Sequence, residues 1–599
     1  MNERARLRFL SPQDDAATLT PVTRFSQVHG ATVAGRAGAT YRRSDERTDR
    51  TPRMTTLVRV ESGFLVACPR WLGRPAVAAP LLAGVLSVVW ALWLAHDAGD
   101  LAAQYAWTAF VRQHPGSADN LSWYGGIHPA SYSVLSPYVM AWIGVRTTGV
   151  LACTAGAALG ALLLVRSGLP RPLLPALWLA VAVWCNIASG RVTYTLGMAF
   201  ALGAAVLVLD RRDGRWRPVV AALLGVVATM SSPVAGLFVD VLAAALFLAG
   251  RRRRAYLLMP GPPLVIGATT LLFPFYGVQP FPWYSAVPTL AAAVAVAVLV
   301  PRAWRLVRAG AWTYAVGVGL CWALPTPIGS NVQRLALLAG TAVLVCAMPA
   351  RDRRGWTVAT RTAAAALAVW TVAQPVADFI STAPDTITTA RAQPLITELS
   401  QLDAELGRVE VVPLRTHWEA AGLAPYVDLA RGWNRQADVE RNPLFYDNTL
   451  TAASYHDWLR DWGVRYVVQA AQEPDSSGLA EAKIIARGNP WLHRVWGDAD
   501  WRVYRVDGTD PLAASPATVR HAGSAALTLT MPRAGSVLLR VAWSPWLAID
   551  GVDDDAKPRA CLARNGTWTE LTTTGPGTFT IEARYAFDRG TPCPTVPSH

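Results

Sequence analysis

The stretch AVAAPLLAGVLSVVWALWLA (residues 76–95) is an uncharged apolar run that leads directly into HDAGDLAAQY (residues 96–105). A helix of about twenty apolar residues can cross a bilayer, so this run predicts a first membrane span. Asp97 and Asp100 then lie where the chain leaves the membrane. Because carboxylates are costly close to hydrocarbon, acids at such a position are candidates for function.

The composition indicates that this span is one of many. The 599-residue chain is 52% hydrophobic and only 16% charged, which is unusual for a soluble protein of this size. Ten further apolar runs follow, at about residues 147–165, 172–187, 192–209, 218–230, 234–250, 255–273, 286–300, 310–324, 335–349 and 359–376. The predicted fold class is therefore a polytopic α-helical membrane protein with about eleven spans.

The arginines between these runs alternate in density. The connections RSGLPR, DRRDGRWR, RRRR, PRAWRLVR and ARDRRGW are rich in arginine, whereas ASGR, SSP, PFYGVQPFPWYS and PTPIGSNVQR carry one arginine or none. The positive-inside rule places the first set in the cytoplasm. We therefore expect a cytoplasmic N-terminus, an outer loop over residues 96–146 and an extracytoplasmic tail after residue 377. The formal charge of +14 is then explained by topology, and no nucleic-acid partner is expected.

The ends of the chain differ from its middle. Residues 1–75 begin with a polar, arginine-rich segment that predicts a disordered basic cytoplasmic N-terminus, and the translation start is open between Met1 and Met54. In the tail, short strand-like runs flank an amphipathic stretch, which predicts a mixed α/β domain over residues 378–508. From residue 509 to 599, alternating segments such as SAALTLTM and TFTIEARYAF predict a domain resembling a β-sandwich.

The outer loop carries most of the candidate site residues. Asp97 and Asp100 are three residues apart and share a helix face, so either could act as a general base. A solvated helix start is the alternative explanation for this pair. Aromatic and hydrogen-bonding groups follow and are candidates for substrate binding: Gln104, Trp123, Tyr124 and His128. An interfacial loop with its aromatic rings at headgroup depth is the alternative for these.

Three arginines, Arg146, Arg191 and Arg334, break the charge alternation and lie on the predicted outer side. Arg191 and Arg334 each follow a small polar segment at a span boundary, and Asn331 belongs to the second of these segments. Arginine matches the oxygens of phosphate, so a lipid-linked phosphate is the predicted ligand, with a snorkelling arginine as the alternative. Trp433 and Arg435 lie in a polar segment of the tail that is expected to contact a glycan or to rest on the membrane domain.

The sequence shows no motif with the spacing of metal ligands and one possible cysteine pair. The seven cysteines form no CxxC motif, and no second histidine lies at ligand spacing from His128, so no metal site is predicted. Cys561 and Cys593 could form a disulfide if the tail is extracytoplasmic.

The order of these parts, with the patterns HDAGDLAAQY, WYGGIHPASYS, SNVQRL, YHDWLRDWGVRYVV and WSPWLAIDG, resembles the GT-C superfamily of integral-membrane glycosyltransferases, in its actinobacterial form. The resemblance implies a polyprenyl-phosphate-sugar donor in the outer leaflet and a cell-envelope glycan or lipid acceptor. It also implies that a loop carboxylate, Asp97 or Asp100, is the base and that outer arginines hold the donor phosphate. The cofactor is left open, since some members use a divalent cation.

The function predicted from the sequence is therefore an inverting membrane glycosyltransferase of the plasma membrane. A secondary transporter is one alternative; it predicts inverted repeats and charged residues at mid-bilayer. A non-catalytic envelope scaffold that binds glycans is the other, and it predicts that removing Asp97 and Asp100 leaves function intact.

Overall fold

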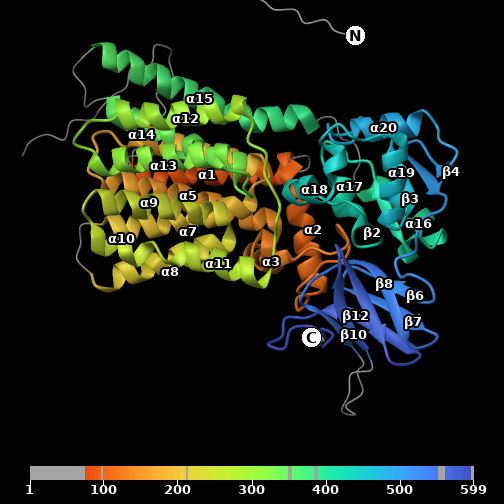
Figure 1. Cartoon of the computed structure of the whole chain (residues 1–599). Helices are drawn as coiled ribbons and strands as arrows, with labels where there is room; N and C mark the ends of the chain where they lie inside the picture. Colours follow the sequence, from red (N-terminus) through yellow and green to blue (C-terminus); the bar gives the residue numbers. More distant parts are fainter. Residues whose placement is uncertain are drawn as a thin grey trace, which may run out of the picture. The chain divides into compact units, whose positions relative to one another are not determined.

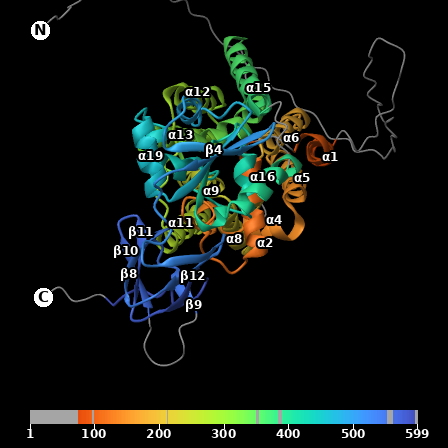
Figure 2. The ribbon, with the colours of Figure 1, turned by 90° about the vertical axis from the view of Figure 1, so that its right-hand side faces the viewer.

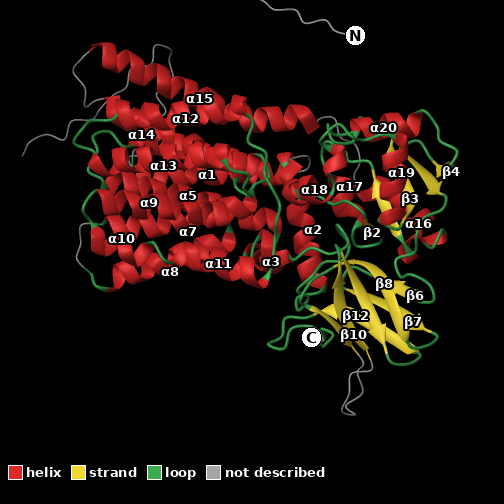
Figure 3. Ribbon diagram, in the orientation of Figure 1, coloured by secondary structure: helices red, strands yellow, loops and turns green. Residues whose placement is uncertain are grey.

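The computed structural model describes residues 74–95, 99–210, 214–348, 354–382, 389–550 and 560–594 (Figure 1). The N-terminal segment that was expected to be disordered falls almost entirely outside these ranges, as does Asp97. Strands begin only after residue 407, so helices and loops make up the described residues between 74 and 407 (Figure 3).

Each of the predicted apolar runs coincides with one helix or with consecutive helices. The bounds are α1 Pro75–Val89 with η2 Trp90–Leu94, α5 Val145–Arg166, α6 Leu173–Ala188, α7 Val192–Leu209, α8 Trp216–Ser231, α9 Pro233–Leu248, α10 Arg252–Leu258 with α11 Gly261–Leu272, α12 Trp283–Leu299, α13 Arg305–Ala323, η3 Gly329–Gln333 with η4 Ala336–Gly340 and α14 Thr341–Ala347, and α15 Arg354–Thr382.

Six of these helical segments are long and apolar enough to cross a membrane, and they are Pro75–Leu94, Val145–Arg166, Val192–Leu209, Arg252–Leu272, Gly329–Ala347 and Gly355–Thr382. Shorter apolar helices of 10–17 residues accompany them at α6, α8, α9 and α12. The described residues therefore fit a membrane protein. The number of eleven spans stays a prediction, because the other helices do not meet the same criteria of length and composition.

Small residues let the bundle pack closely around α5. Its buried face carries Gly149, Cys153, Ala157 and Ala161, spaced four residues apart, against α1, α6 and α7. A Cβ at Gly149 would lie 3.0 Å from the ring of Trp90, so only glycine lets that ring reach the helix backbone. Small residues at helix contacts are typical of membrane helices, where close packing replaces the hydrophobic effect.

The two sets of connections lie at opposite ends of the bundle. At one end Arg166 donates to Asp210 at 3.0 Å and Arg254 donates to the Val208 carbonyl at 2.9 Å, so three arginine-rich connections meet there. The arginine-poor connections meet at the other end, next to α2 (Gly99–Gln113), α3 (Pro129–Tyr132) and α4 (Ser136–Ile143) (Figure 1). The alternation seen in the sequence thus separates the two ends in space.

A five-stranded sheet forms the first part of the tail. The strands run in the order β2-β1-β3-β5-β4, where β1 (Arg408–Val411) pairs in parallel with β2 (Asp428–Leu429) and β3 (Val464–Ala470), and β5 (Trp501–Val506) pairs antiparallel with β3 and β4 (Leu492–Gly497). The accompanying helices are α16 Thr389–Gln401, α17 Trp418–Leu423, α18 Arg435–Arg441, α19 Ala452–Asp461 and α20 Leu479–Ala486, with the short turns η6 Ala404–Leu406 and η7 Pro443–Phe445.

The second part of the tail contains two packed antiparallel sheets. One has the order β10-β11-β8 (Ala560–Asn565, Trp568–Thr573, Gly535–Ala542) and the other β6-β7-β12-β9 (Thr518–Ala522, Ala526–Met531, Gly577–Ala583, Leu547–Asp550). Alternate residues such as Leu527, Leu529 and Met531 are buried between them, as expected for a sandwich. A disulfide joins Cys561 to Cys593. Figure 2 shows the strands of the sandwich below α19, and Arg540 of β8 donates to the carbonyl of Asp461 at the end of α19 at 2.8 Å.

The segment between α2 and α3 fastens these parts to one another. The Ser122 carbonyl accepts from the amide of Leu429 in β2 at 2.8 Å, and the Gly125 carbonyl accepts from Ala542 in β8 at 2.8 Å. Farther along, the indole of Trp546 donates to the Leu272 carbonyl at the end of α11, at 2.7 Å. The segment between α2 and α3 therefore fixes both tail parts at the end of the bundle where the arginine-poor connections meet.

Candidate functional site

A cavity of about 370 Å³ lies where α2 and α3, the arginine-poor connections and the tail meet. Its walls bring together residues that are far apart in the sequence, and those predicted as site residues are Asp100, Gln104, Arg191, Asn331, Arg334, Trp433 and Arg435. Ser232, Phe275 and Gln279 line it as well, so every arginine-poor connection contributes. Clefts of this size at the junction of several parts are the usual place for a ligand.

One carboxylate and two guanidinium groups face each other in this cavity. Asp100 Oδ2 lies 3.4 Å from Arg191 Nε and 3.9 Å from Arg334 Nη2. The carboxylate keeps 40% of its side-chain surface exposed, whereas the two arginines keep only 15% and 16%. The site therefore presents an accessible oxygen acceptor next to two largely buried cations. These cations are available to a phosphate that enters the cavity.

Gln104 fixes α2 against the start of α7. Its amide nitrogen donates to the Gly190 carbonyl at 2.6 Å, and its amide oxygen accepts from both the backbone and the hydroxyl of Thr193. Gly190 has a φ of +75°, and a Cβ there would lie 2.6 Å from the Leu101 amide nitrogen. The glycine thus lets the chain before Arg191 approach the helix turn that carries Asp100.

Arg334 is held by a polar turn at the start of its helix. It lies over the ring of Tyr194, with 5.1 Å between its guanidinium carbon and the ring centroid. The turn that precedes it is secured by Tyr314, whose hydroxyl donates to the Val332 carbonyl at 2.7 Å, and by Gln279, whose amide donates to Ser330 at 3.1 Å. A cation over an aromatic face is stabilised even when it is largely removed from water.

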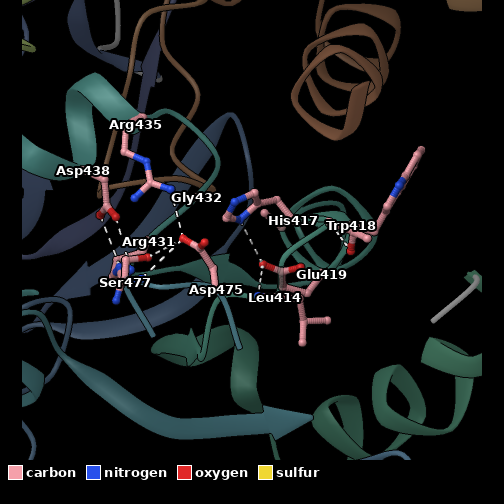
Figure 4. A network of polar contacts seen from close by, with 12 residues as sticks. Leu414, His417, Trp418, Glu419, Arg431, Gly432, Arg435, Asp438, Asp475 and Ser477 are labelled. Carbon is pink, nitrogen blue, oxygen red and sulfur yellow. Dashed lines mark hydrogen bonds and ion pairs between the residues drawn. The ribbon is translucent and has the colours of Figure 1, made fainter. Parts of the chain in front are cut away.

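The tail supplies the wall opposite the helices. Trp433 stacks on His417 with ring centroids 3.5 Å apart, and Arg435 lies 5.4 Å from the centroid of the same indole. Arg435 also donates to Asp475 at 2.9 Å (Figure 4). A second bond runs from Arg435 to Tyr446 at 3.3 Å. Because Arg435 stabilises the charged carboxylate, it contributes to lowering the pKa of Asp475 against the effect of burial. The tail wall of the cavity is thus a rigid aromatic and cationic surface.

Behind this wall lies a buried ionic cluster centred on Arg431. Its guanidinium lies 3.2 Å from Asp438, 3.3 Å from Glu481 and 3.6 Å from Glu410. The side chains of Arg431, Glu410 and Glu481 are at most 2% exposed. Tyr446 bonds to both Asp438 and Arg435, so the cluster is connected to the cavity wall. Burial, followed by the neighbouring Glu481, raises the pKa of Glu410 well above its usual value.

This cluster predicts a pH-dependent stability of the tail. A glutamate in the unfolded chain titrates near pH ~4.3, whereas folded Glu410 keeps its proton to higher pH. Above pH ~4.3 the folded state therefore binds more protons than the unfolded state, so the free energy of unfolding falls as the pH rises, by up to about 1.4 kcal/mol per pH unit. Glu410→Gln removes this group, and we expect a shallower decline of the melting temperature between pH 5 and pH 8. If the melting temperatures of the wild type and Glu410→Gln fall with the same slope over this pH range, the pKa of Glu410 is not raised by folding.

Three predicted residues of the outer loop lie outside the cavity lining. Trp123 is fully buried against Gly432 and Trp107, and Tyr124 donates to the Gly432 carbonyl at 2.7 Å. His128 contacts the Ala118 carbonyl at 2.9 Å and packs against Phe273. In this structure these side chains join the segment between α2 and α3 to the tail and to Phe273 just after α11, and a role for them in substrate binding stays a prediction.

Two lining or neighbouring residues were not singled out from the sequence. Tyr132 lines the cavity beside Asp100, and burial, together with this carboxylate, raises the pKa of Tyr132 to about 12. Asp378 lies near the end of α15, with its Oδ2 3.8 Å from Arg191 Nη2. Its place as an acid just after the last apolar run is the one sequence signal that could have drawn attention to Asp378.

In the part of the chain that the structure describes, no three His, Cys, Asp or Glu side chains are gathered as metal ligands would be. Asp100 faces arginines, and such neighbours disfavour a cation.

Comparison with known proteins adds two findings. A family model described as a domain of unknown function, DUF8823, matches residues 514–598, which include all strands of the sandwich. Among solved structures, the chain is similar to arabinofuranosyltransferase AftD from Mycobacteria, with 17% sequence identity and a TM-score of 0.42. The matched region covers 74% of this chain and 40% of the AftD chain. A mutant form of AftD is 13% identical with a TM-score of 0.39, and the match covers 86% of this chain and 61% of the AftD chain.

This chain thus spans less than two thirds of the length of either AftD structure. Similarity at these TM-scores assigns neither a fold nor an activity to it. No curated protein matches the chain.

Proposed function

We propose that the chain is a membrane glycosyltransferase of the GT-C type, which transfers a sugar from a polyprenyl-phosphate donor to a cell-envelope acceptor on the outer face of the membrane. The observation that carries this proposal is the cavity in which the accessible carboxylate of Asp100 faces Arg191 and Arg334. A base for a hydroxyl and cations for a phosphate are the two functions that such a transfer needs.

The reaction follows from these groups. The acceptor hydroxyl attacks the anomeric carbon of the donor sugar, and its proton passes to the Asp100 carboxylate. The bond from the anomeric carbon to the phosphate oxygen breaks at the same time, and the electron pair leaves with the lipid phosphate. Arg191 and Arg334 stabilise the charge that develops on this phosphate. A single displacement of this kind inverts the configuration at the anomeric carbon. Asp97 is the alternative base, and it lies outside the described residues.

An apolar cavity in the bundle supports a lipid-linked donor. It has a volume of about 260 Å³ and is lined almost entirely by aliphatic side chains of α9, α12, α13 and η4. Leu335 and Ala336 line it, and they directly follow Arg334 in the chain. Tyr314 lies in its wall and bonds to the turn that carries Arg334. The phosphate of a polyprenyl phosphate could thus bind Arg334 while its chain enters the bundle.

The proposed orientation is supported by charge and by cysteine chemistry. The arginine-rich connections lie at the end of the bundle opposite the cavity, which the positive-inside rule assigns to the cytoplasm. The disulfide between Cys561 and Cys593 is typical of an oxidising compartment, and it lies in the tail near the cavity end. Both features favour a cavity that faces outward.

Lipid analysis of a strain that lacks this chain tests the proposal. The expected result is accumulation of one polyprenyl-phosphate sugar, together with loss of the same sugar from the cell envelope, because its consumer is missing. The accumulated lipid would also identify the donor. Unchanged lipid-linked sugars and an unchanged envelope would contradict the proposed function.

Arg334→Gln is expected to raise the KM for this donor about ten- to a hundredfold, since a hydrogen bond to a charged group contributes about 1.5–3 kcal/mol. Arg334→Lys keeps the charge and should restore part of the affinity. Arg166→Gln is the matched control, because Arg166 is half-exposed and pairs with Asp210 at the other end of the bundle. Equal donor KM values for Arg334→Gln and Arg166→Gln would exclude Arg334 from phosphate binding.

A further inference from the structure

A second cavity of about 360 Å³ adjoins the first. It is lined by the connection between α11 and α12, by α18, by the end of α19 and by the β10–β11 turn. Its lining side chains include Phe275, Tyr276, Glu440, Arg441, Asp461 and Trp568. The residues of the catalytic proposal, Asp100, Arg191 and Arg334, are not among its lining residues.

The two cavities share a wall. Phe275 lines both of them. Helix α18 also runs past both, because Arg435 and Gln436 line the first cavity and Ala437, Glu440 and Arg441 line the second. At a rise of about 1.5 Å per residue, Gln436 and Glu440 are separated by roughly 6 Å along the helix. The residues of α18 that line the two cavities are thus about one helical turn apart.

The second cavity combines an exposed aromatic ring with unpaired carboxylates. Tyr276 is 77% exposed. Among the described residues, no donor forms a hydrogen bond to the carboxylate of Glu440 or Asp461. The guanidinium of Arg441 binds the protein backbone, since its Nη1 donates to the carbonyls of Tyr124 at 2.8 Å and Gly126 at 2.7 Å. Two free carboxylates and an engaged arginine disfavour an anionic ligand, and the same charges disfavour a hydrocarbon chain.

We propose that this second cavity binds the non-reacting end of a neutral saccharide acceptor, so that the acceptor is a glycan and not a lipid. This inference rests on the proposed function. Tyr276 provides a flat apolar face for a sugar ring, and Glu440 accepts hydrogen bonds from its hydroxyl groups. The terminal sugar of the acceptor then reaches past Phe275, and its hydroxyl meets Asp100 in the first cavity.

Binding of free oligosaccharides to the full chain in lipid nanodiscs tests this site without any donor. The probes are neutral oligosaccharides of three to six pentose or hexose units, and the measurement is isothermal titration calorimetry. Tyr276→Ala and Glu440→Gln change exposed side chains, so both variants should fold. Each is expected to weaken binding at least tenfold. Tyr426→Ala is the matched control, because this exposed tyrosine lines a separate cavity between α16 and β6. The affinity of Tyr426→Ala for the oligosaccharides should stay within twofold of the wild-type value.

Three results would overturn the inference: no probe binds the wild type, Tyr276→Ala and Glu440→Gln bind as the wild type does, or Tyr426→Ala alone weakens binding. The assay contains no donor and no transfer step, so its outcome does not depend on Asp100. If the deletion strain accumulates no lipid-linked sugar but Glu440→Gln still loses glycan binding, the proposed function fails and the glycan site stands.

Discussion

Replacing Asp100 with asparagine is expected to lower the rate of sugar transfer by about 10²- to 10⁴-fold, the usual contribution of a general base. Asparagine has nearly the same shape as aspartate and can accept a hydrogen bond, but it cannot take the proton of the acceptor hydroxyl. Binding of the donor should change less than the rate, because Arg191 and Arg334 remain in place. Transfer is measured in membranes with the lipid donor that the deletion strain accumulates.

Asp240→Asn is the matched control for this prediction. Asp240 is an acid of helix α9, and it does not line the cavity that contains Asp100. Its replacement should leave transfer within about twofold of the wild type. If Asp100→Asn transfers sugar as fast as Asp240→Asn does, Asp100 is not the base. Loss of function in Asp240→Asn alone would favour a transporter, since an acid within the bundle would then be essential.

Arg431→Met is expected to destabilise the tail by about 3–5 kcal/mol, the usual result of removing one partner from a buried ion pair. The substitution leaves the acidic side chains of Glu410, Glu481 and Asp438 buried without their cation. It also removes the contact of the guanidinium with the ring of Phe445, whose centroid lies 3.9 Å away. Thermal unfolding followed by tryptophan fluorescence measures the effect.

The control for this prediction is Arg415→Met in the same part of the tail. Arg415 pairs with Glu473 at 2.6 Å, but both side chains are exposed, at 44% and 64%. Exposed ion pairs contribute about 0–1 kcal/mol, so the melting temperature should change little. Equal shifts for Arg431→Met and Arg415→Met would show that the buried cluster does not stabilise the tail.

The helical segments and the separation of the two bundle ends could be predicted from the sequence. Apolar runs and arginine density are local properties, and each can be read from a short stretch. The same reasoning singled out Asp100, Arg191 and Arg334 as candidates, because a charged residue at the end of an apolar run is conspicuous. The structure places these three together although more than two hundred residues separate Asp100 from Arg334.

Other parts of the site could not be predicted in this way. Trp123 and Tyr124 resemble sugar-binding residues in composition, but whether an aromatic ring faces a cavity or a protein core depends on the partner that covers it. Here the partner is the segment around Gly432, some three hundred residues away. Asp378 was missed for the same reason, because only its distance to Arg191 gives it significance.

Cysteine labelling in spheroplasts tests most directly the central claim that the Asp100 cavity faces outward. Tyr276→Cys places an exposed thiol beside the cavity, and Arg253→Cys places one at the arginine-rich end. The unmodified chain gives the background, since three of its four free cysteines in the described part are buried. We predict that a membrane-impermeant maleimide labels Tyr276→Cys in intact spheroplasts and Arg253→Cys only after permeabilisation. The reverse pattern would place Asp100 on the cytoplasmic side and contradict the account.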